Sequence, residues 1–97
     1  MQTTTIALVG AGGKMGCRIT DNFLKHPEYL VHYLEVSAQG QANLLARNVT
    51  VSSATDALPV ADVVILAVPD VAIGAVSREL GPQMKPGALL MTLDPAA

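Results

Sequence analysis

The sequence is poor in cysteine, in aromatic residues and in charge, and each shortage narrows the classes of protein it can represent. A single cysteine, Cys17, cannot form an internal disulfide. Only 14% of the residues are charged and the formal net charge is −2, which leaves no electrostatic footprint for nucleic acid. No apolar run approaches the ~20 residues that a membrane span needs. We therefore expect neither a nucleic-acid partner nor a membrane association.

The start of the chain also lacks the basic region of a secretory signal peptide and leads directly into an apolar strand pattern. Together with the lone cysteine, this favours the cytosol as the compartment. A length of 97 residues allows one domain at most. Hydrophobic residues make up 51% of the chain, which is typical of an α/β domain whose parallel strands are buried on both faces.

Four glycines cluster directly after the first apolar strand pattern. The glycines of this loop are Gly10, Gly12, Gly13 and Gly16. Such a loop lets the backbone leave a strand tightly and approach a pyrophosphate with no Cβ in the way. The strict Gly-x-Gly-x-x-Gly motif fails here, because Met15 stands where the third glycine would fall and Gly16 comes one residue later. We expect a valine at Gly12 to clash with a ligand whose pyrophosphate is bound by this loop.

A helical pattern follows the glycines and should aim its free N–H groups and its positive dipole end at the phosphates. The expected pyrophosphate donors are the backbone N–H groups of Gly13, Lys14 and Met15. The side chain of Lys14 either adds charge to this site or is merely solvated. Cys17 is expected to pack under the loop as a small residue rather than to act as a reactive thiol.

The second strand pattern ends in an acid at the spacing of a ribose-binding residue. Glu35 lies 19 positions after Gly16, and a dinucleotide site places its acid about 20 positions on. A carboxylate there accepts hydrogen bonds from both adenosine ribose hydroxyls and repels a 2′-phosphate, and the next arginine, Arg47, is twelve residues further on. The spacing therefore favours NAD. Ser37, with Ala38 beside it, is expected to donate a hydrogen bond to ribose or adenine; a ligand-free loop with a solvated Glu35 is the alternative.

Strand patterns alternate with helical patterns along the whole chain. The predicted strands are 6–10, 30–36, 49–51, 62–68 and 88–93, and the predicted helical segments are 13–25, 39–46, 53–58 and 70–80. This alternation indicates a parallel sheet with right-handed crossovers. The expected fold is α/β, a Rossmann-type doubly wound parallel sheet with strand order 3-2-1-4-5. In that order Gly10 and Val68 flank the topological switch point, where ligands bind such sheets.

The fourth predicted strand ends at Val68 and Pro69, beside the glycine loop in the expected sheet. The backbone of these two residues would lie along the nicotinamide half of a dinucleotide. Asp70 follows at the start of the predicted helix, where an N-cap role is favoured over a direct ligand contact. Asp94, after the last strand, either caps the next element or orients substrate. No residue has the partners at suitable spacing for a metal site.

With these residues assigned, the chain resembles the cofactor domain of the 6-phosphogluconate dehydrogenase-like superfamily, which includes β-hydroxyacid and prephenate dehydrogenases. The resemblance covers all 97 residues and rests on segments 9–16, 61–70 and 85–94. The loop departs from the simplest pattern of the superfamily, Gly-x-Gly-x-Met-Gly, by one extra residue. Within the superfamily, segments 10–16, 34–37 and 93–97 in combination look most like an enzyme that oxidises a branched sugar acid with NAD and rearranges the product to a 3-oxo acid. Prephenate and β-hydroxyacid dehydrogenases are the alternatives.

The resemblance implies an NAD-dependent oxidoreductase acting on a hydroxy acid or sugar acid. In this superfamily the catalytic groups come mostly from a following helical domain. We therefore expect residues 1–97 to be the N-terminal dinucleotide-binding domain of a longer enzyme, inactive alone and dimeric through the missing domain. The uncovered apolar edge of the last strand, 88–93, also favours continuation or dimerisation over a free monomer. A non-catalytic module that binds a dinucleotide to report redox state is the alternative from another class.

Overall fold

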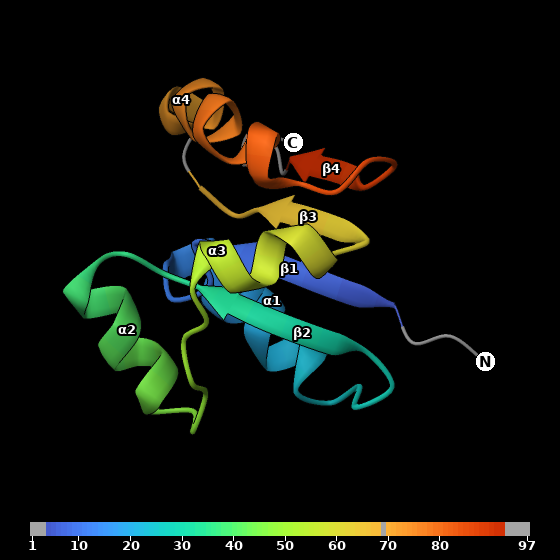
Figure 1. Ribbon diagram of the computed structural model, residues 1–97. Coiled ribbons are helices and arrows are strands. Elements are labelled where there is room, and N and C mark those ends of the chain that lie inside the picture. Colours follow the sequence, from blue (N-terminus) through green and yellow to red (C-terminus); the bar gives the residue numbers. More distant parts are fainter. Residues whose placement is uncertain (1–3, 69, 93–97) are drawn as a thin grey trace.

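The protein is a parallel four-stranded sheet with helices on both faces (Figure 1), seen here in a computed structural model that describes residues 4–68 and 70–92. In chain order the elements are β1 (Thr5–Val9), α1 (Lys14–Phe23), β2 (Leu30–Leu34), α2 (Ala38–Leu45), α3 (Ala54–Ala57), the 3-10 turn η1 (Leu58–Val60), β3 (Val63–Leu66), α4 (Asp70–Leu80), the 3-10 turn η2 (Gly81–Gln83) and β4 (Leu89–Thr92). The strand order is β2-β1-β3-β4, and every pairing is parallel. The predicted doubly wound sheet is confirmed, with β3 and β4 as its fourth and fifth predicted strands.

The predicted third strand, 49–51, is reduced to a single bridge between Val51 and Tyr33 of β2. Because β1 pairs with the other edge of β2, the bridge lies on the side where that strand was expected. Val49 is buried, and both valines belong to the apolar cluster beneath α1 and α2. The two valines pack in the core as their apolar character predicts, but the segment forms one bridge and no ladder of strand pairing.

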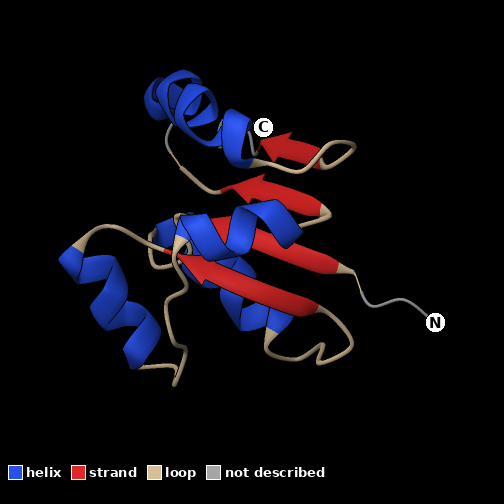
Figure 2. Ribbon diagram, in the orientation of Figure 1, coloured by secondary structure: helices blue, strands red, loops and turns tan. Residues whose placement is uncertain are grey.

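The core consists of two layers of apolar side chains, one on each face of the sheet. Helices cover both faces (Figure 2). Successive strand residues point to opposite faces. Leu8 and Ile65 accordingly pack beneath α1 and α2, whereas Ala7 and Leu66 pack beneath α3, η1 and α4. Both layers converge on the carboxyl ends of β1 and β3, so the loops that follow these strands are supported from both sides.

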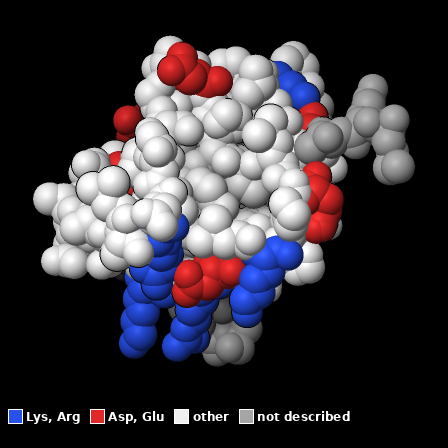
Figure 3. All heavy atoms as spheres, turned by 90° about the horizontal axis from the view of Figure 1, so that it is seen from below, with Lys and Arg blue, Asp and Glu red and all other residues white. Residues whose placement is uncertain are grey.

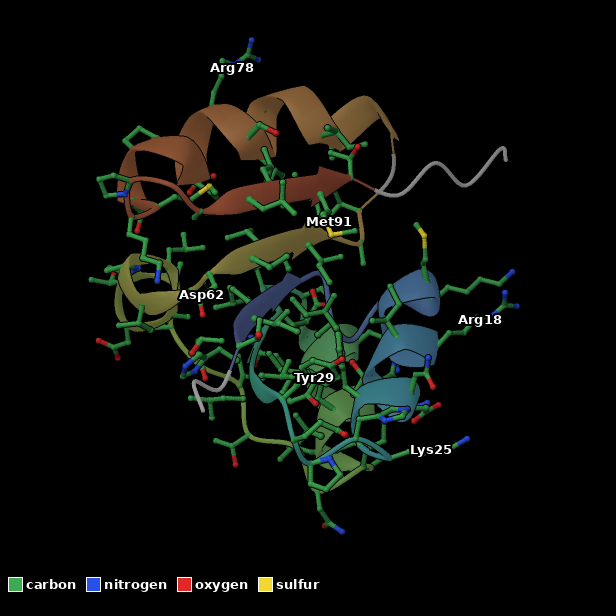
Figure 4. All side chains as sticks on the ribbon, turned by 90° about the vertical axis from the view of Figure 1, so that its right-hand side faces the viewer. Arg18, Lys25, Tyr29, Asp62, Arg78 and Met91 are labelled. Carbon is green, nitrogen blue, oxygen red and sulfur yellow. The ribbon has the colours of Figure 1, made fainter. Side chains whose placement is uncertain are left out.

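The last strand, β4, is exposed along its whole length. Leu89 and Met91 expose 57% and 43% of their surface, and Met91 is labelled in Figure 4. The apolar edge expected for the last strand is therefore present. No helix in the described part of the chain is long and apolar enough to cross a membrane.

The amino ends of the strands are joined by Asp62, which precedes β3. One oxygen of its carboxylate accepts a hydrogen bond from the Thr5 N–H at 2.9 Å, and the other pairs with the Lys85 ammonium. The Lys85 hydrogen bond, followed by that of Thr5, holds the pKa of Asp62 below its ordinary value of 3.8. This contact lies at the edge of the sheet opposite the glycine loop, so we assign it to stability rather than to the site.

Candidate functional site

The loop between β1 and α1 turns at Gly10, where the ends of three strands meet. Gly10 has a φ of +79°, a left-handed conformation that favours glycine. Its N–H and that of Ala11 both donate to the carbonyl of Leu34 at the end of β2, at 2.8 and 3.1 Å. A Cβ on Gly10 would lie 2.5 Å from the carbonyl oxygen of Ala67, just after β3. The loop is therefore anchored to both neighbouring strands with no space for a side chain.

Gly16 takes the packing role of the third glycine, although it comes one residue late. A Cβ there would lie 2.8 Å from the Cα of Ala11 and closer still to the carbonyl oxygen of Gly10. The first turn of α1 therefore rests directly on the loop, as the third glycine of a dinucleotide-binding motif allows. The extra residue is absorbed at Gly13, the N-cap of α1, where a Cβ would meet only one neighbour, at 3.4 Å.

The start of α1 leaves backbone donors without partners. The N–H groups of Lys14, Met15 and Gly16 form no hydrogen bond with any residue between 4 and 68 or between 70 and 92. Gly13 provides no side-chain cap, and the first turn holds no acidic residue. A helix terminus of this kind carries a partial positive charge and suits an anionic group. Lys14 is exposed beside it.

The carbonyl groups of the loop are held from within by three side chains. Thr20, which is fully buried, donates its hydroxyl to the carbonyl of Ala11 at 3.1 Å. The Cys17 thiol and the Asn43 amide both donate to the carbonyl of Gly12, at 3.3 and 2.9 Å. Cys17 thus supports the loop, as the sequence indicated. Asn43 was not foreseen, because no motif marks a residue of α2 that contacts a loop 31 positions earlier.

Glu35 follows β2 and directs its carboxylate at the glycine loop. One oxygen accepts a hydrogen bond from the Gly12 N–H at 2.9 Å. The other accepts three, from the N–H groups of Val36 and Ser37 at 3.0 Å and from the Ser37 hydroxyl at 3.1 Å. The acid and the glycine loop, which the sequence paired by spacing alone, are therefore in direct contact.

Ser37 has a structural role that the sequence did not reveal. It is the N-cap of α2, and its hydroxyl oxygen accepts a hydrogen bond from the Gly40 N–H at 3.0 Å. The same hydroxyl donates to Glu35. The predicted contact of Ser37 with ribose or adenine stays a prediction, and Ala38 is the first residue of α2.

A cavity of about 380 Å³ opens at the carboxyl ends of β1, β2 and β3. Its walls include Leu34, Val68, Val76 and Leu80, and its polar lining includes Glu35. Its volume lies within the usual range of ligand pockets, and its mainly apolar character suits a flat aromatic ring.

The switch-point residues are adjacent, as expected from the strand order. The side chain of Val68 lies 3.0 Å from the position of a Cβ on Gly10. Pro69 lies outside the described residues, as does Asp94. The helix α4 begins at Asp70 itself, which places this residue in the first turn rather than before the helix. The predicted contacts of its side chain also lie outside what is described.

A salt bridge on the molecular surface joins α1 to the segment just after α2. Figure 3 shows basic and acidic side chains next to one another on the face seen from below. Arg47 pairs with Asp21 at 2.7 Å and donates to the carbonyl of Asn43 at 2.9 Å, and its hydrogen bond lowers the pKa of Asp21. Arg18 of α1 and Lys25, just after α1, project away from the sheet (Figure 4). Arg47 is thus engaged between α1 and α2 rather than placed beside Glu35.

Comparison with known proteins agrees with this geometry. A protein named D-apionate oxidoisomerase from Pectobacterium atrosepticum is 53% identical over 93 residues, covering 96% of this chain and 32% of its own length. A protein of the same name from Cupriavidus necator is 48% identical over 93 residues, covering 95% of this chain and 33% of its own. This chain therefore spans about a third of the length of these curated relatives. Their name matches the branched-sugar-acid enzyme to which the sequence pointed.

A solved structure shows the same fold with a ligand. It is described as a semialdehyde dehydrogenase NAD-binding protein from Cupriavidus necator in complex with calcium and NAD, with a TM-score of 0.90 and 46% identity. The match covers 99% of this chain and 35% of that one. The family model described as NADP oxidoreductase, coenzyme F420-dependent, matches residues 5–93. The chain therefore belongs to this family of oxidoreductases.

Proposed function

We propose that this chain is the dinucleotide-binding domain of a longer NAD-dependent oxidoreductase. The observation that carries the proposal is the placement of the Glu35 carboxylate against the Gly12 N–H, beside a helix start with three backbone N–H groups left unpaired by the described residues. An acid for the ribose and donors for the pyrophosphate are the two polar requirements of a dinucleotide site. The NAD held by the solved relative supports the same interpretation.

The described residues fit the parts of NAD in order. Glu35 would accept hydrogen bonds from the adenosine ribose, and Ser37 and Ala38 would lie on the adenine side. The N–H groups of Lys14, Met15 and Gly16 would surround the pyrophosphate, beside the loop glycines Gly10 and Gly12. The N–H of Gly13, which the sequence also predicts as a donor, instead donates to the Gly10 carbonyl at 3.1 Å. Val68 and Pro69 would lie along the nicotinamide half. When bound, NAD supplies a hydride acceptor, and these residues hold and orient it.

The choice of NAD over NADP rests on charge. The family description names NADP, which carries an additional 2′-phosphate on the adenosine ribose. The Glu35 carboxylate would repel that phosphate. Arg47, the first arginine after the second strand, pairs with Asp21 instead. The site therefore favours NAD within a family described by NADP.

The substrate is proposed as a hydroxy acid or sugar acid, with D-apionate as the first candidate because of the relatives' names. Prephenate and β-hydroxyacid dehydrogenase activities of the 6-phosphogluconate dehydrogenase-like type are the alternatives. We assign no catalytic residue to this chain. A general base from a further domain would complete the site, so residues 1–97 alone should bind NAD without turning substrate over. Dimerisation through that domain and a cytosolic location belong to the same proposal.

The test is a fluorescence or calorimetric titration of the protein with NADH and with NADPH, in parallel with Glu35→Ala. We expect a preference for NADH that disappears in the variant. Glu28→Ala is the matched control, because it removes an exposed acid that pairs only with His26 among the described residues. Failure of the wild-type protein to bind either dinucleotide would contradict the proposal. NADH formation from D-apionate by the 97-residue protein would contradict its inactivity alone.

A further inference from the structure

We infer that Gly40 determines cofactor selectivity by positioning Glu35, an inference that rests on the proposed NAD site. Gly40 lies in the first turn of α2 and is buried. Glycine is among the least favourable residues in a helix interior, so helix propensity gives no reason for its presence. The reason for a glycine at this position lies in its tertiary contacts.

Gly40 lies against both the glycine loop and the acid. A Cβ on Gly40 would lie 2.5 Å from the Cγ and Oε1 atoms of Glu35, and closer still to the Cδ. In the other direction, a Cβ on Gly12 would lie 2.6 Å from the Cα of Gly40. Three segments of the chain therefore meet with no room for a side chain on either glycine. The space that Gly40 leaves open is the space in which the Glu35 carboxylate lies.

The carboxylate cannot yield to a Cβ at this position without losing a partner. Its oxygen nearest to Gly40 is the one that accepts the Gly12 N–H at 2.9 Å. Its other oxygen is bound to the Ser37 hydroxyl, which in turn accepts the Gly40 N–H. One carboxylate oxygen is thus bonded to the glycine loop and the other to the N-cap of α2, and a Cβ on Gly40 would push between them. A methyl group at Gly40 would move the carboxylate away from the loop, where a ribose would be bound.

The expected effect follows from the hydrogen bonds that Glu35 would no longer offer. Loss of charge-assisted hydrogen bonds to the ribose should weaken NADH binding by about tenfold or more. NADPH binding should weaken less or improve, because the displaced carboxylate no longer repels a 2′-phosphate. Gly40→Ala should therefore move the ratio of the two dissociation constants toward that of Glu35→Ala.

The experiment compares the wild-type protein, Gly40→Ala, Glu35→Ala and the double variant by titration with NADH and NADPH. Gly74→Ala is the matched control, because Gly74 lies within α4 and a Cβ there meets nothing within 4 Å. In the Glu35→Ala background the three atoms nearest to the added methyl are absent. We therefore expect Gly40→Ala to have almost no further effect on selectivity there, as required of residues that act through one another.

A second readout needs no cofactor. The Gly12 amide resonance should shift in Gly40→Ala as it does in Glu35→Ala, because both variants break the same hydrogen bond, and should not shift in Gly74→Ala. If Gly40→Ala does not fold, the double variant should fold; a double variant that is also unfolded would contradict the inference. Unchanged selectivity, additive effects or an unmoved Gly12 amide would overturn it. If the wild-type protein bound neither dinucleotide, both the NAD site and the selectivity role of Gly40 would be rejected. The shift of the Gly12 amide resonance would still decide whether Gly40 positions Glu35.

Discussion

Replacement of Gly16 by alanine is the sharpest test of the loop geometry, because local and tertiary arguments predict opposite signs. Gly16 and Gly74 both lie within α-helices. On helix propensity alone, alanine should stabilise either position by up to about 1 kcal/mol. A Cβ at Gly74 meets nothing within 4 Å, so there the full gain is expected.

At Gly16 the contact with the loop reverses the sign. A Cβ would lie 2.8 Å from the Cα of Ala11, whereas ordinary van der Waals contacts begin at 3.4 Å, and the carbonyl oxygen of Gly10 is nearer still. Both neighbours are backbone atoms of an anchored loop, so α1 itself must move. Overpacking of this kind costs about 1–3 kcal/mol, and since the clash is with backbone we expect a net loss of about 1–2 kcal/mol after the propensity gain.

The assay is thermal unfolding followed by circular dichroism for the two variants and the wild-type protein. For a domain of this size, 1 kcal/mol corresponds to about 4–8 °C in melting temperature. Gly74→Ala should therefore raise the melting temperature by about 4–8 °C, and Gly16→Ala should lower it by about 5–15 °C. A rise of similar size in both variants would refute the packing of α1 on the loop.

Four further outcomes are expected. Gly12→Val should lower the melting temperature without any cofactor, because the structure places the backbone of Gly40 against this glycine, whereas the sequence suggested only a clash with the cofactor. Lys14→Ala should weaken NADH binding by about two- to fivefold at low salt and less at high salt, measured by titration. Asn43→Leu should cost about 1 kcal/mol in chemical denaturation and also weaken NADH binding, because a hydrogen bond to the loop is lost. The pKa of Asp62 is lowered from 3.8 in the folded protein, so the ionised carboxylate contributes its full stabilisation above pH 3.8 and loses it as the pH falls through the lowered pKa. Asp62→Asn should therefore lose less stability than the wild-type protein when the pH is lowered below about 4. Melting curves at a series of pH values would measure this difference.

Much of the fold could be predicted from the sequence because its signals are local. Apolar runs of strand length, a glycine cluster and the alternation of strands with helices determine a parallel sheet through short-range geometry. The boundaries of β1, β2, α2 and α4 differ from the predicted ones by at most two residues at either end. The prediction of a full strand at 49–51 was wrong, since only Val51 forms a bridge to β2. A short apolar pattern looks the same whether the segment pairs with a neighbouring strand or packs against a helix.

The candidate site was likewise predicted only in part from the sequence. The contact of Glu35 with the glycine loop followed from a spacing of 19 residues, since β1, α1 and β2 form a unit of nearly constant geometry. The roles of Gly40 and Asn43 had no such signal. Asn43 contacts the Gly12 carbonyl across 31 positions. Gly40 lies only five positions after Glu35 but also contacts Gly12, 28 positions earlier, and both contacts with Gly12 require α2 to pack against the glycine loop.

The sequence by itself determined the class of fold, the position of the loop and the acid that faces it, because these depend on residue type and on spacing within one βαβ unit. Only the tertiary structure decided which glycine carries the helix packing, which one leaves room for the acid and which side chain holds the loop. Those roles depend on how closely particular atoms approach one another in the folded chain, and neither residue type nor spacing specifies such a distance.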